Sequence, residues 1–530
     1  MEDKGEATET QQQQQQMVEE LPPIDESVVF RKEDFDREAH VLGVVVRASV
    51  ANAARVALEP VMLHLRKVRN IRDVPTTAPG AEPEKMLLLA EEYATVAAVV
   101  AHCPGTPAAA ALAPFVETAE EQEGKQEQEA NKQEQETTET GWRVERVEHG
   151  VAVAVYWQSV GLGAMLRALL PAAAVRAAGG EVPTAFETVG YIAHVNLRAP
   201  LLPYRHAIGA AVLAKNPRLR TVVTKTASIE NAYRTFPLAV IAGAPALETD
   251  VRESGCLFRL NLADVYWNSR LQTEHARLVA TLGRAAAVWD LMAGVGPFAL
   301  PAARNGCTVA ANDLNPRSYA YLVANRARNA VDPARCVCSN LDARAFVRQH
   351  VHAYLQRHGG SSSSSNGGTS TSTATPASAA TATTEGGVPA LPSHVIMNLP
   401  ATALEFLDVF GDAVRGGWPG RPVIHCYCFS RSLDAPAADI AARARAAIGP
   451  EGVVVRVRDV HDVRDVAPGK HMYLITLRVF AATDAAVPSE EEERAAHVRE
   501  LRDALTAVTA GTTTSSKKSA KTQGIKRARE

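Results

Sequence analysis

The stretch VWDLMAGVGPFALPAARNGCTVAANDLNP, residues 288–316, constrains the fold of this chain more than any other feature of its sequence. One apolar run ends at Asp290, Gly294 and Gly296 follow, and a second apolar run ends at Asp313. Strand, glycine turn, helix and strand in this order predict a parallel α/β unit. Glycines at such a turn let the backbone approach a ligand. The stretch therefore predicts a nucleotide-binding site.

Polar residues also follow two later strands of the same block. CVCSNLDAR places Asp342 after a third strand, and HVIMNLPA places Asn398 and Pro400 after a fourth. Ligands of open parallel sheets bind at the carboxyl ends of the strands, so these residues should lie near the glycine turn. Asp313 suits both hydroxyls of a ribose, and Asp342 suits an adenine amino group. Asn398 and the rigid Pro400 suit a flat nitrogen base, although both residues are also common in plain turns.

The glycine turn is compatible with more than one cofactor. Gly294-Val-Gly296-Pro-Phe-Ala299 fits the dinucleotide fingerprint, which tolerates alanine in third place. Pro297 sits where a helix would offer N–H groups to a pyrophosphate, which NAD has and S-adenosylmethionine lacks. The pattern therefore favours S-adenosylmethionine over NAD. In a non-catalytic RNA-binding protein with a dead cofactor pocket, we would expect the strand-end acids to be replaced or the glycine turn to be filled by side chains. This sequence shows neither change.

The composition argues against a membrane-spanning protein, a disulfide-rich protein and a zinc protein. The 530 residues have a formal net charge of −3 and are 46% hydrophobic, and no apolar run predicts a membrane span. Seven cysteines are too few for a disulfide framework in a chain of this length. The pairs Cys336/Cys338 and Cys426/Cys428 lack a second pair at zinc spacing, so we expect buried cysteines and no metal.

Four segments of biased composition divide the chain. They predict an amino-terminal tail, two surface inserts and a carboxyl-terminal tail with a basic end, at residues 1–30, 117–141, 359–387 and 486–530. Between them we expect a small α+β domain, a basic α+β domain and a Rossmann-like domain, at residues 31–116, 142–285 and 286–485. Residues 53–73 predict a helix, whose end would carry Arg66, Lys67, Arg69 and Arg72.

The middle block has a local excess of positive charge. Between Tyr191 and Phe236, seven Lys or Arg residues stand against one acid, Glu230. Such a surface suits phosphates, and the interleaved tyrosines suit stacking on bases. The alternative is a solvated basic face with the tyrosines in the core. The seven cations are Arg198, Arg205, Lys215, Arg218, Arg220, Lys225 and Arg234.

Motifs in order over about residues 185–480 resemble the archaeal and eukaryotic tRNA (guanine-N1)-methyltransferase family. They are GYIAHVNLR, PYRHAIGAAVLAKNPRLRTVVTK, NAYRTFPLAVIAG, VYWNSRLQTEHARLV, DLMAGVGPFALPAA, NDLNP, MNLPA and VAPGKHMYLITLR. That family methylates the guanosine 3′ of the anticodon, at tRNA position 37. The resemblance implies a class I methyltransferase fold, S-adenosylmethionine as donor and tRNA as substrate. Another S-adenosylmethionine-dependent RNA methyltransferase on the same fold is the alternative.

Methylation of guanine N1 requires a base, because that nitrogen carries a proton. Glu274 is the candidate, since Ser269 and Gln272 form a capping-box pattern that predicts a helix start beside it. The apolar face of that helix would be Leu271, Leu278 and Leu282. Negative charge spreads onto O6 during the reaction, and Arg234 is the candidate cation for it.

The resemblance implies the remaining contacts. Asn398 would hold the base edge as a catalytic residue and also contact the cofactor. The other cofactor residues would be His275, Asp290, Gly294, Gly296, Asp313, Leu314, Asp342 and Ala343. Substrate contacts would be Arg198, Arg205, Tyr233 and Pro400. We expect a monomer, located in the cytoplasm, the nucleus or the mitochondrial matrix. Whether a magnesium ion assists the proton transfer stays open.

Overall fold

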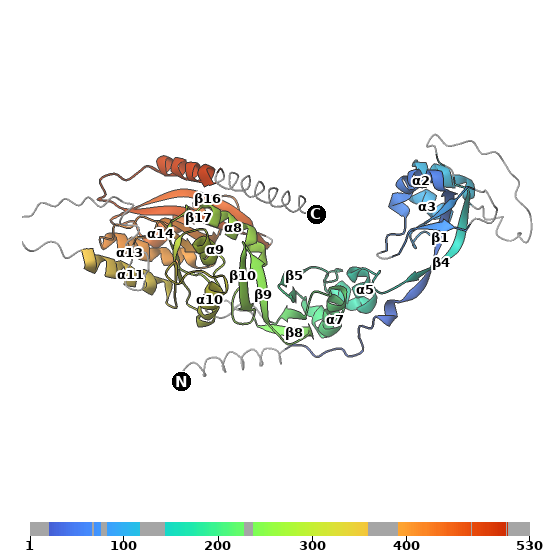
Figure 1. Cartoon of the computed structure of the whole chain (residues 1–530), viewed down its shortest axis with the longest axis horizontal. Helices are drawn as coiled ribbons and strands as arrows, with labels where there is room; N and C mark the ends of the chain where they lie inside the picture. The colour runs from blue at the N-terminus through green and yellow to red at the C-terminus, as the bar shows by residue number, and fades with distance from the viewer. Residues whose placement is uncertain are drawn as a thin grey trace, which may run out of the picture.

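The computed structural model describes most of the chain (Figure 1). The described residues are 21–65, 68–75, 82–116, 142, 144–226, 237–358, 391–467, 469–504 and 506. Their strands form a seven-stranded sheet, two four-stranded sheets and a two-stranded hairpin. Within these ranges, no helix combines the length and the apolar character needed to cross a membrane.

The seven-stranded sheet has the order β13-β12-β11-β14-β15-β17-β16. Five strands are parallel, and β17 pairs antiparallel with β15 and β16. The chain order reverses between β11 and β14, which is where ligands bind in open α/β sheets. The strands are β11 (Ala287–Asp290), β12 (Thr308–Asn312), β13 (Cys336–Ser339), β14 (His394–Met397), β15 (Val423–Phe429), β16 (Val453–Ala467) and β17 (Lys470–Ala481). The predicted class I, Rossmann-like fold is confirmed.

Helices cover both faces of this sheet, which explains why its central strands are apolar throughout. Successive side chains of a strand point to opposite faces, so Trp289 joins one hydrophobic core and Val288 the other. The core around Trp289 lies under α11 (Ala343–His358), α13 (Asp408–Arg415) and α14 (Pro436–Ile448). The core around Val288 includes α8 (Gln272–Thr281), α9 (Ala299–Arg304) and α10 (Pro316–Arg328).

The hairpin of β9 (Glu248–Glu253) and β10 (Cys256–Asn261) packs on the same core as Val288. Phe258 of β10 and Leu278 of α8 are both buried there. The predicted boundary at residue 285 is therefore wrong, because residues from β9 onward belong to the core of the seven-stranded sheet. A count of strand and helix signals could not show which core each element joins.

The middle sheet has the order β5-β6-β7-β8 and is covered by α5, α6 and α7. Only β6 and β7 run parallel. The elements are β5 (Phe186–Val189), β6 (Ile192–Val195), β7 (Thr221–Lys225), β8 (Leu238–Gly243), α5 (Leu162–Leu169), α6 (Ala172–Ala177) and α7 (Arg205–Lys215). The β-branched and apolar runs TVVTK and LAVIAG form β7 and β8.

The amino-terminal sheet, order β2-β3-β1-β4, stands apart from the other two in Figure 1. Its fourth strand shows that the predicted boundary at 116 is wrong, since β4 pairs antiparallel with β1 across the insert 117–141. The insert itself lies outside the described residues. The elements are β1 (Arg37–Arg47), β2 (Ile71–Val74), β3 (Glu84–Leu88), β4 (Arg146–Val155), α2 (Ala51–Leu58), α3 (Val96–His102) and α4 (Pro107–Leu112).

The helix predicted over residues 53–73 is wrong in its second half. Helix α2 ends at Leu58, two residues before Pro60, which has no N–H to continue the ladder. Arg72 lies in β2 and not at a helix end. Arg66 and Lys67, two of the four predicted cations, lie outside the described residues.

A helix over residues 490–504 replaces part of the predicted carboxyl-terminal tail. Glu493 of this helix is buried and pairs with Arg458 of β16 at 2.9 Å and with Arg478 of β17 at 3.0 Å. The helix lies along the two antiparallel strands in Figure 1. The sequence did not indicate this helix, because the cationic partners of Glu493 are distant in sequence. The insert predicted at residues 359–387 lies outside the described residues.

Candidate active site

A cavity of about 650 Å³ lies at the carboxyl ends of the central parallel strands. That volume is in the range of small-molecule sites, about 300–1,000 Å³. Predicted cofactor residues from four successive strand ends line it: Gly294, Asp313, Leu314, Asp342, Ala343 and Asn398, and with them His275 and Pro400. The sheet therefore brings together residues that are up to 125 positions apart in the sequence.

The glycine turn and Asp313 are joined by a hydrogen bond. The N–H of Gly294 donates to Asp313 Oδ2 at 2.7 Å, and the N–H of Asn315 donates to Oδ1 at 2.9 Å. Each carboxylate oxygen keeps a free lone pair, so Asp313 is able to accept two further hydrogen bonds from a ligand. Burial raises the pKa of Asp313, while the two N–H groups oppose the rise.

The two glycines have different reasons to be glycine. Gly296 has φ +99°, and a Cβ there would lie 2.8 Å from side-chain carbons of Leu300 and Leu322. Gly294 has φ +55°, and a Cβ there would meet no atom within 4 Å. Gly296 therefore allows close packing beneath the turn, whereas Gly294 lines the cavity and leaves space open.

Asp290 ends β11 as predicted, but it lies beneath the cavity and does not line it. Its carboxyl group is fully buried. Burial, with a contribution from Asp313, raises the pKa of Asp290 to about 8. Asp290 is therefore a buried acid of the core that acts on the cavity only through neighbours such as Asp313.

Asp342 and Asn398 also line the cavity. Asp342 Oδ1 caps α11 by accepting from the N–H groups of Arg344 and Ala345, at 2.9 and 3.1 Å. Among the hydrogen bonds of the described residues, none uses its Oδ2, which is thus available to a ligand. Asn398 begins a turn in which Leu399 O accepts from the N–H of Thr402 and Ala403.

His275 reaches the cavity from α8 and is held by a residue that the sequence did not single out. Its Nδ1 lies 2.6 Å from Oε1 of Glu253, and both side chains are buried. The ring also packs edge-on against Phe298, with centroids 4.6 Å apart. No signal in the sequence joined Glu253 to this site, because it ends a hairpin strand that pairs with no strand of the parallel sheet.

Glu274 lies at the start of α8 as predicted, but it does not line the cavity. Its carboxylate accepts from Arg277 Nε and Nη2, at 2.6 and 2.7 Å, and from the Tyr427 hydroxyl at 2.7 Å. Burial and the neighbouring Glu274 raise the pKa of Tyr427 well above its usual value, so this hydroxyl keeps its proton and donates. The described conformation therefore satisfies Glu274 within the protein.

The predicted cap of this helix is wrong. Asn268, not Ser269, accepts from the N–H of Arg270 at the start of the preceding 3₁₀ turn. Ser269 instead gives its hydroxyl and N–H to Glu187 Oε1 of β5, at 2.7 and 3.1 Å. The predicted apolar face is confirmed, since Leu271, Leu278 and Leu282 are buried.

The predicted substrate cations differ in accessibility. Arg205 is buried and donates to the carbonyls of Pro22 and Leu202 at 2.7 and 2.9 Å, so in this conformation it is a structural residue and not a phosphate contact. Burial also lowers its pKa. Arg198 is exposed, donating to Ala178 O and pairing with Glu181 at 3.7 Å. Tyr233 and Arg234 lie outside the described residues.

The tip of the β16–β17 hairpin contributes cavity residues that the sequence did not predict. Arg464, Val466, Lys470 and Met472 line the cavity, and the Lys470 ammonium lies 4.3 Å from the ring centre of Phe429, another lining residue. The motif VAPGKHMYLITLR marked this region by resemblance only. Its place at the cavity depends on β17 lying antiparallel beside β15.

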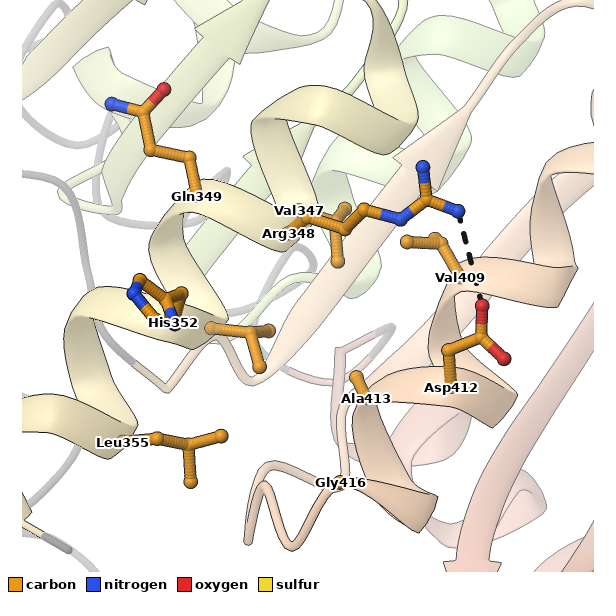
Figure 2. Close-up of a pocket in the computed structure, with 10 residues that line it drawn as sticks. Val347, Arg348, Gln349, His352, Leu355, Val409, Asp412, Ala413 and Gly416 are labelled. Carbon is orange, nitrogen blue, oxygen red and sulfur yellow. Dashed lines mark ion pairs between the residues drawn. The ribbon is translucent and has the colours of Figure 1, made fainter.

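A second cavity, of about 500 Å³, lies between α11 and α13 (Figure 2). Val347, Leu355, Val409 and Ala413 are among its lining residues, and Arg348 pairs with Asp412 across it at 3.9 Å. None of the predicted site residues lines it. The first cavity is therefore the candidate active site.

Comparisons with known proteins identify two family domains in this chain. The TRM5/TYW2 methyltransferase domain matches residues 249–354, and the TYW2 N-terminal domain matches residues 165–246. These matches meet near β9, where the structure places the boundary between the two cores.

Two curated relatives carry the name tRNA (guanine(37)-N(1))-methyltransferase. The one from Phytophthora infestans is 42% identical over 302 residues, which are 57% of this chain and 64% of that relative. The one from Trichomonas vaginalis is 38% identical over 316 residues, which are 59% of this chain and 73% of that relative. The chain thus matches less than two thirds of the length of the first.

A solved structure, the crystal structure of Trm5b from Pyrococcus abyssi, has the same fold. It aligns with a TM-score of 0.51 and 22% identity, covering 83% of this chain and 99% of that one.

Proposed function

Because this chain belongs to the tRNA (guanine(37)-N(1))-methyltransferase family, we propose that it methylates N1 of the guanosine at tRNA position 37. The methyl donor is S-adenosylmethionine. The observation that supports this best is the cavity, which unites the glycine turn with Asp313, Asp342 and Asn398 at the switch point of the sheet.

The residues present fit the donor. Asp313 has the free lone pairs for two ribose hydroxyls, and Asp342 Oδ2 is free to accept from the adenine amino group. Leu314 is half exposed at the cavity and offers an apolar surface to a flat ring. S-adenosylmethionine, when bound, supplies a methyl group on a positively charged sulfonium. The acidic Asp313 in the cavity wall suits that charge.

Glu274 takes the N1 proton in this proposal. The role requires that its carboxylate leave Arg277 and turn to the substrate, since both oxygens are satisfied inside the protein in the described conformation. Catalytic hydrogen bonds often form only in the substrate complex. Asn398 and Pro400 hold the base at the cavity, and Arg234 stabilises the charge on O6.

The tRNA contacts belong to the middle sheet. Arg220 lies over the ring of the exposed Tyr191, 4.3 Å from its centre, and both side chains are accessible to RNA. Such a pair offers a cation for phosphate and a face for a base. Arg198 adds a second accessible cation.

Methyl transfer to two matched tRNA transcripts tests the function. One transcript carries guanosine at position 37 and the other adenosine, and the donor carries a labelled methyl group. Nucleoside analysis should show 1-methylguanosine from the first and no label in the second. Label at another position of both transcripts would instead support a different RNA methyltransferase on the same fold.

A further inference from the structure

Glu253 and His275 form a buried carboxylate–imidazole pair that reaches the candidate active site. We propose that Glu253 is a positioning residue, which fixes His275 so that its Nε2 accepts a hydrogen bond from the amino group of the methyl donor. This inference rests on the proposed function and assigns a recognition element for the amino-acid end of the donor.

The geometry holds the imidazole ring on two sides. Nδ1 lies 2.6 Å from Glu253 Oε1, and the two side chains are 5% and 2% exposed. The edge contact with Phe298, at an interplanar angle of 73°, fixes the plane of the ring. Phe298 follows the glycine turn, so the ring is oriented by the same loop that lines the cavity.

The side chain of Glu253 is buried, and its contacts within the described part of the chain are few. Among the ion pairs of the described residues, His275 is its one partner. The nearby cation Arg304, on the adjoining α9, donates instead to the carbonyl of Gly255. A buried carboxylate is costly unless it is paired and hydrogen-bonded, and the contact with His275 provides that partner here.

The carboxylate determines which ring nitrogen carries the proton. A carboxylate only accepts, so in the tautomer that we propose Nδ1 donates to Glu253 and the imidazole keeps its lone pair on Nε2. Nε2 has no hydrogen-bond partner among the described residues and is absent from the buried polar atoms without a partner, which agrees with its facing the cavity. The site thus presents a hydrogen-bond acceptor backed by a negative charge.

A positively charged group that donates a hydrogen bond suits such an acceptor. Asp313 and Asp342 account for the ribose hydroxyls and the adenine amino group, and the remaining N–H donor of S-adenosylmethionine is its α-ammonium. The charge of Glu253, transmitted through the ring, complements that cation.

Ligand truncation separates this role from a merely structural one. Calorimetry would compare S-adenosylhomocysteine with 5′-methylthioadenosine, which lacks the amino-acid end, in the wild type, Glu253→Gln and His275→Leu. Both variants should bind S-adenosylhomocysteine roughly ten- to hundredfold more weakly and 5′-methylthioadenosine as the wild type does. The double variant should lose no more than His275→Leu alone, because Glu253 acts through the ring.

Two further measurements sharpen the assignment. S-adenosyl-3-thiopropylamine keeps the amine and lacks the carboxylate, and its binding should fall as much as that of S-adenosylhomocysteine. Glu493→Gln is the matched control, a buried glutamate whose partners are Arg458 and Arg478. Glu493→Gln should lower the melting temperature and leave unchanged the ratio of the affinities for S-adenosylhomocysteine and 5′-methylthioadenosine.

Equal losses for all ligands, or no loss for any, would overturn the inference. A loss that disappears with the thiopropylamine would place the contact at the carboxylate and overturn the assignment of Nε2 as acceptor. If the wild type binds none of the three nucleosides, the proposed function fails, and the inference fails with it.

Discussion

The seven-stranded sheet and the middle sheet differ in how their strands end. Five strands of the first are parallel and finish at one edge, whereas only β6 and β7 are parallel in the second. The residues after β11, β12, β13 and β14 consequently meet in one cavity. Two described cations of the middle block make separate contacts instead, Arg205 with the carbonyls of Pro22 and Leu202 and Arg220 with the ring of Tyr191.

The middle block also uses some of its cations internally. Lys215 donates to the carbonyls of Gln158 and Val160, at 3.0 and 2.6 Å, and Arg205 binds two other carbonyls. Arg218 and Arg220 are exposed. The excess of positive charge along the sequence therefore overstates the charge that the surface offers to RNA.

If the cavity edge is the reactive region, the largest effect should come from Glu274→Gln. The variant keeps the shape of the side chain but cannot take a proton, so the single-turnover rate should fall by roughly 10²–10⁴-fold. Donor and tRNA affinities should change little. Rapid-quench methylation assays measure the rate.

Glu492→Gln is a matched control for that experiment, since Glu492 is also an acid at a helix start and accepts from Ser489. Its rate should equal that of the wild type. A near-normal rate in Glu274→Gln would remove Glu274 as the base and leave the carboxylate as a partner of Arg277 and Tyr427 only.

The two glycines of the turn should differ when each is replaced by alanine. Gly296→Ala forces a Cβ against Leu300 and Leu322 and should cost about 2–4 kcal/mol of unfolding free energy. Gly294→Ala meets no atom and should cost only the strain of positive φ, about 1–2 kcal/mol. Urea unfolding of both variants measures this, and equal costs would contradict the packing role of Gly296.

The buried acid beneath the cavity predicts a dependence of stability on pH. The pKa of Asp290 is about 8 in the folded chain, above its usual value, so between about pH 4 and 8 the folded protein holds a proton that the unfolded chain releases. The stabilisation that the protonated Asp290 contributes is complete below about pH 4 and declines as the pH rises towards 8.

Asp290→Asn has no proton to lose, so its stability relative to the wild type should improve by up to about 1.4 kcal/mol per pH unit over that window. Urea unfolding at pH 5, 7 and 9 checks the trend. A difference that is constant with pH would show that Asp290 ionises normally.

The smallest effects should distinguish the two kinds of cation in the middle block. Arg220→Ala should weaken tRNA binding a few-fold and reduce the salt slope by about one, because it removes the phosphate contact that we propose for this cation. Arg205→Ala should leave that slope unchanged and cost about 1–3 kcal/mol of stability, because two carbonyls lose their donor. A salt titration of filter binding and a melting curve separate the two, and a reversed result would show that RNA reaches Arg205.

Particular residues show why the cavity was more predictable than its surroundings. Asp313, Asp342 and Asn398 follow apolar runs, and parallel pairing alone brings such positions together. Glu253, Arg464 and Lys470 come from antiparallel strands, where nothing in the local sequence indicates which edge or face they reach. Asn268 and Ser269 are both good caps, and only the contact of Ser269 with Glu187 decided between them.

The sequence by itself determined the glycine turn, the order of the strand-end acids and the class of fold, because these follow from local periodicity and from the fixed direction of parallel strands. The tertiary structure alone decided that β4 returns to the amino-terminal sheet, that Glu493 is buried by Arg458 and Arg478, and that Glu253 holds His275. Each of these depends on a partner distant in the sequence. Burial and pairing of a charge are properties of the packed chain and not of the residues that carry it.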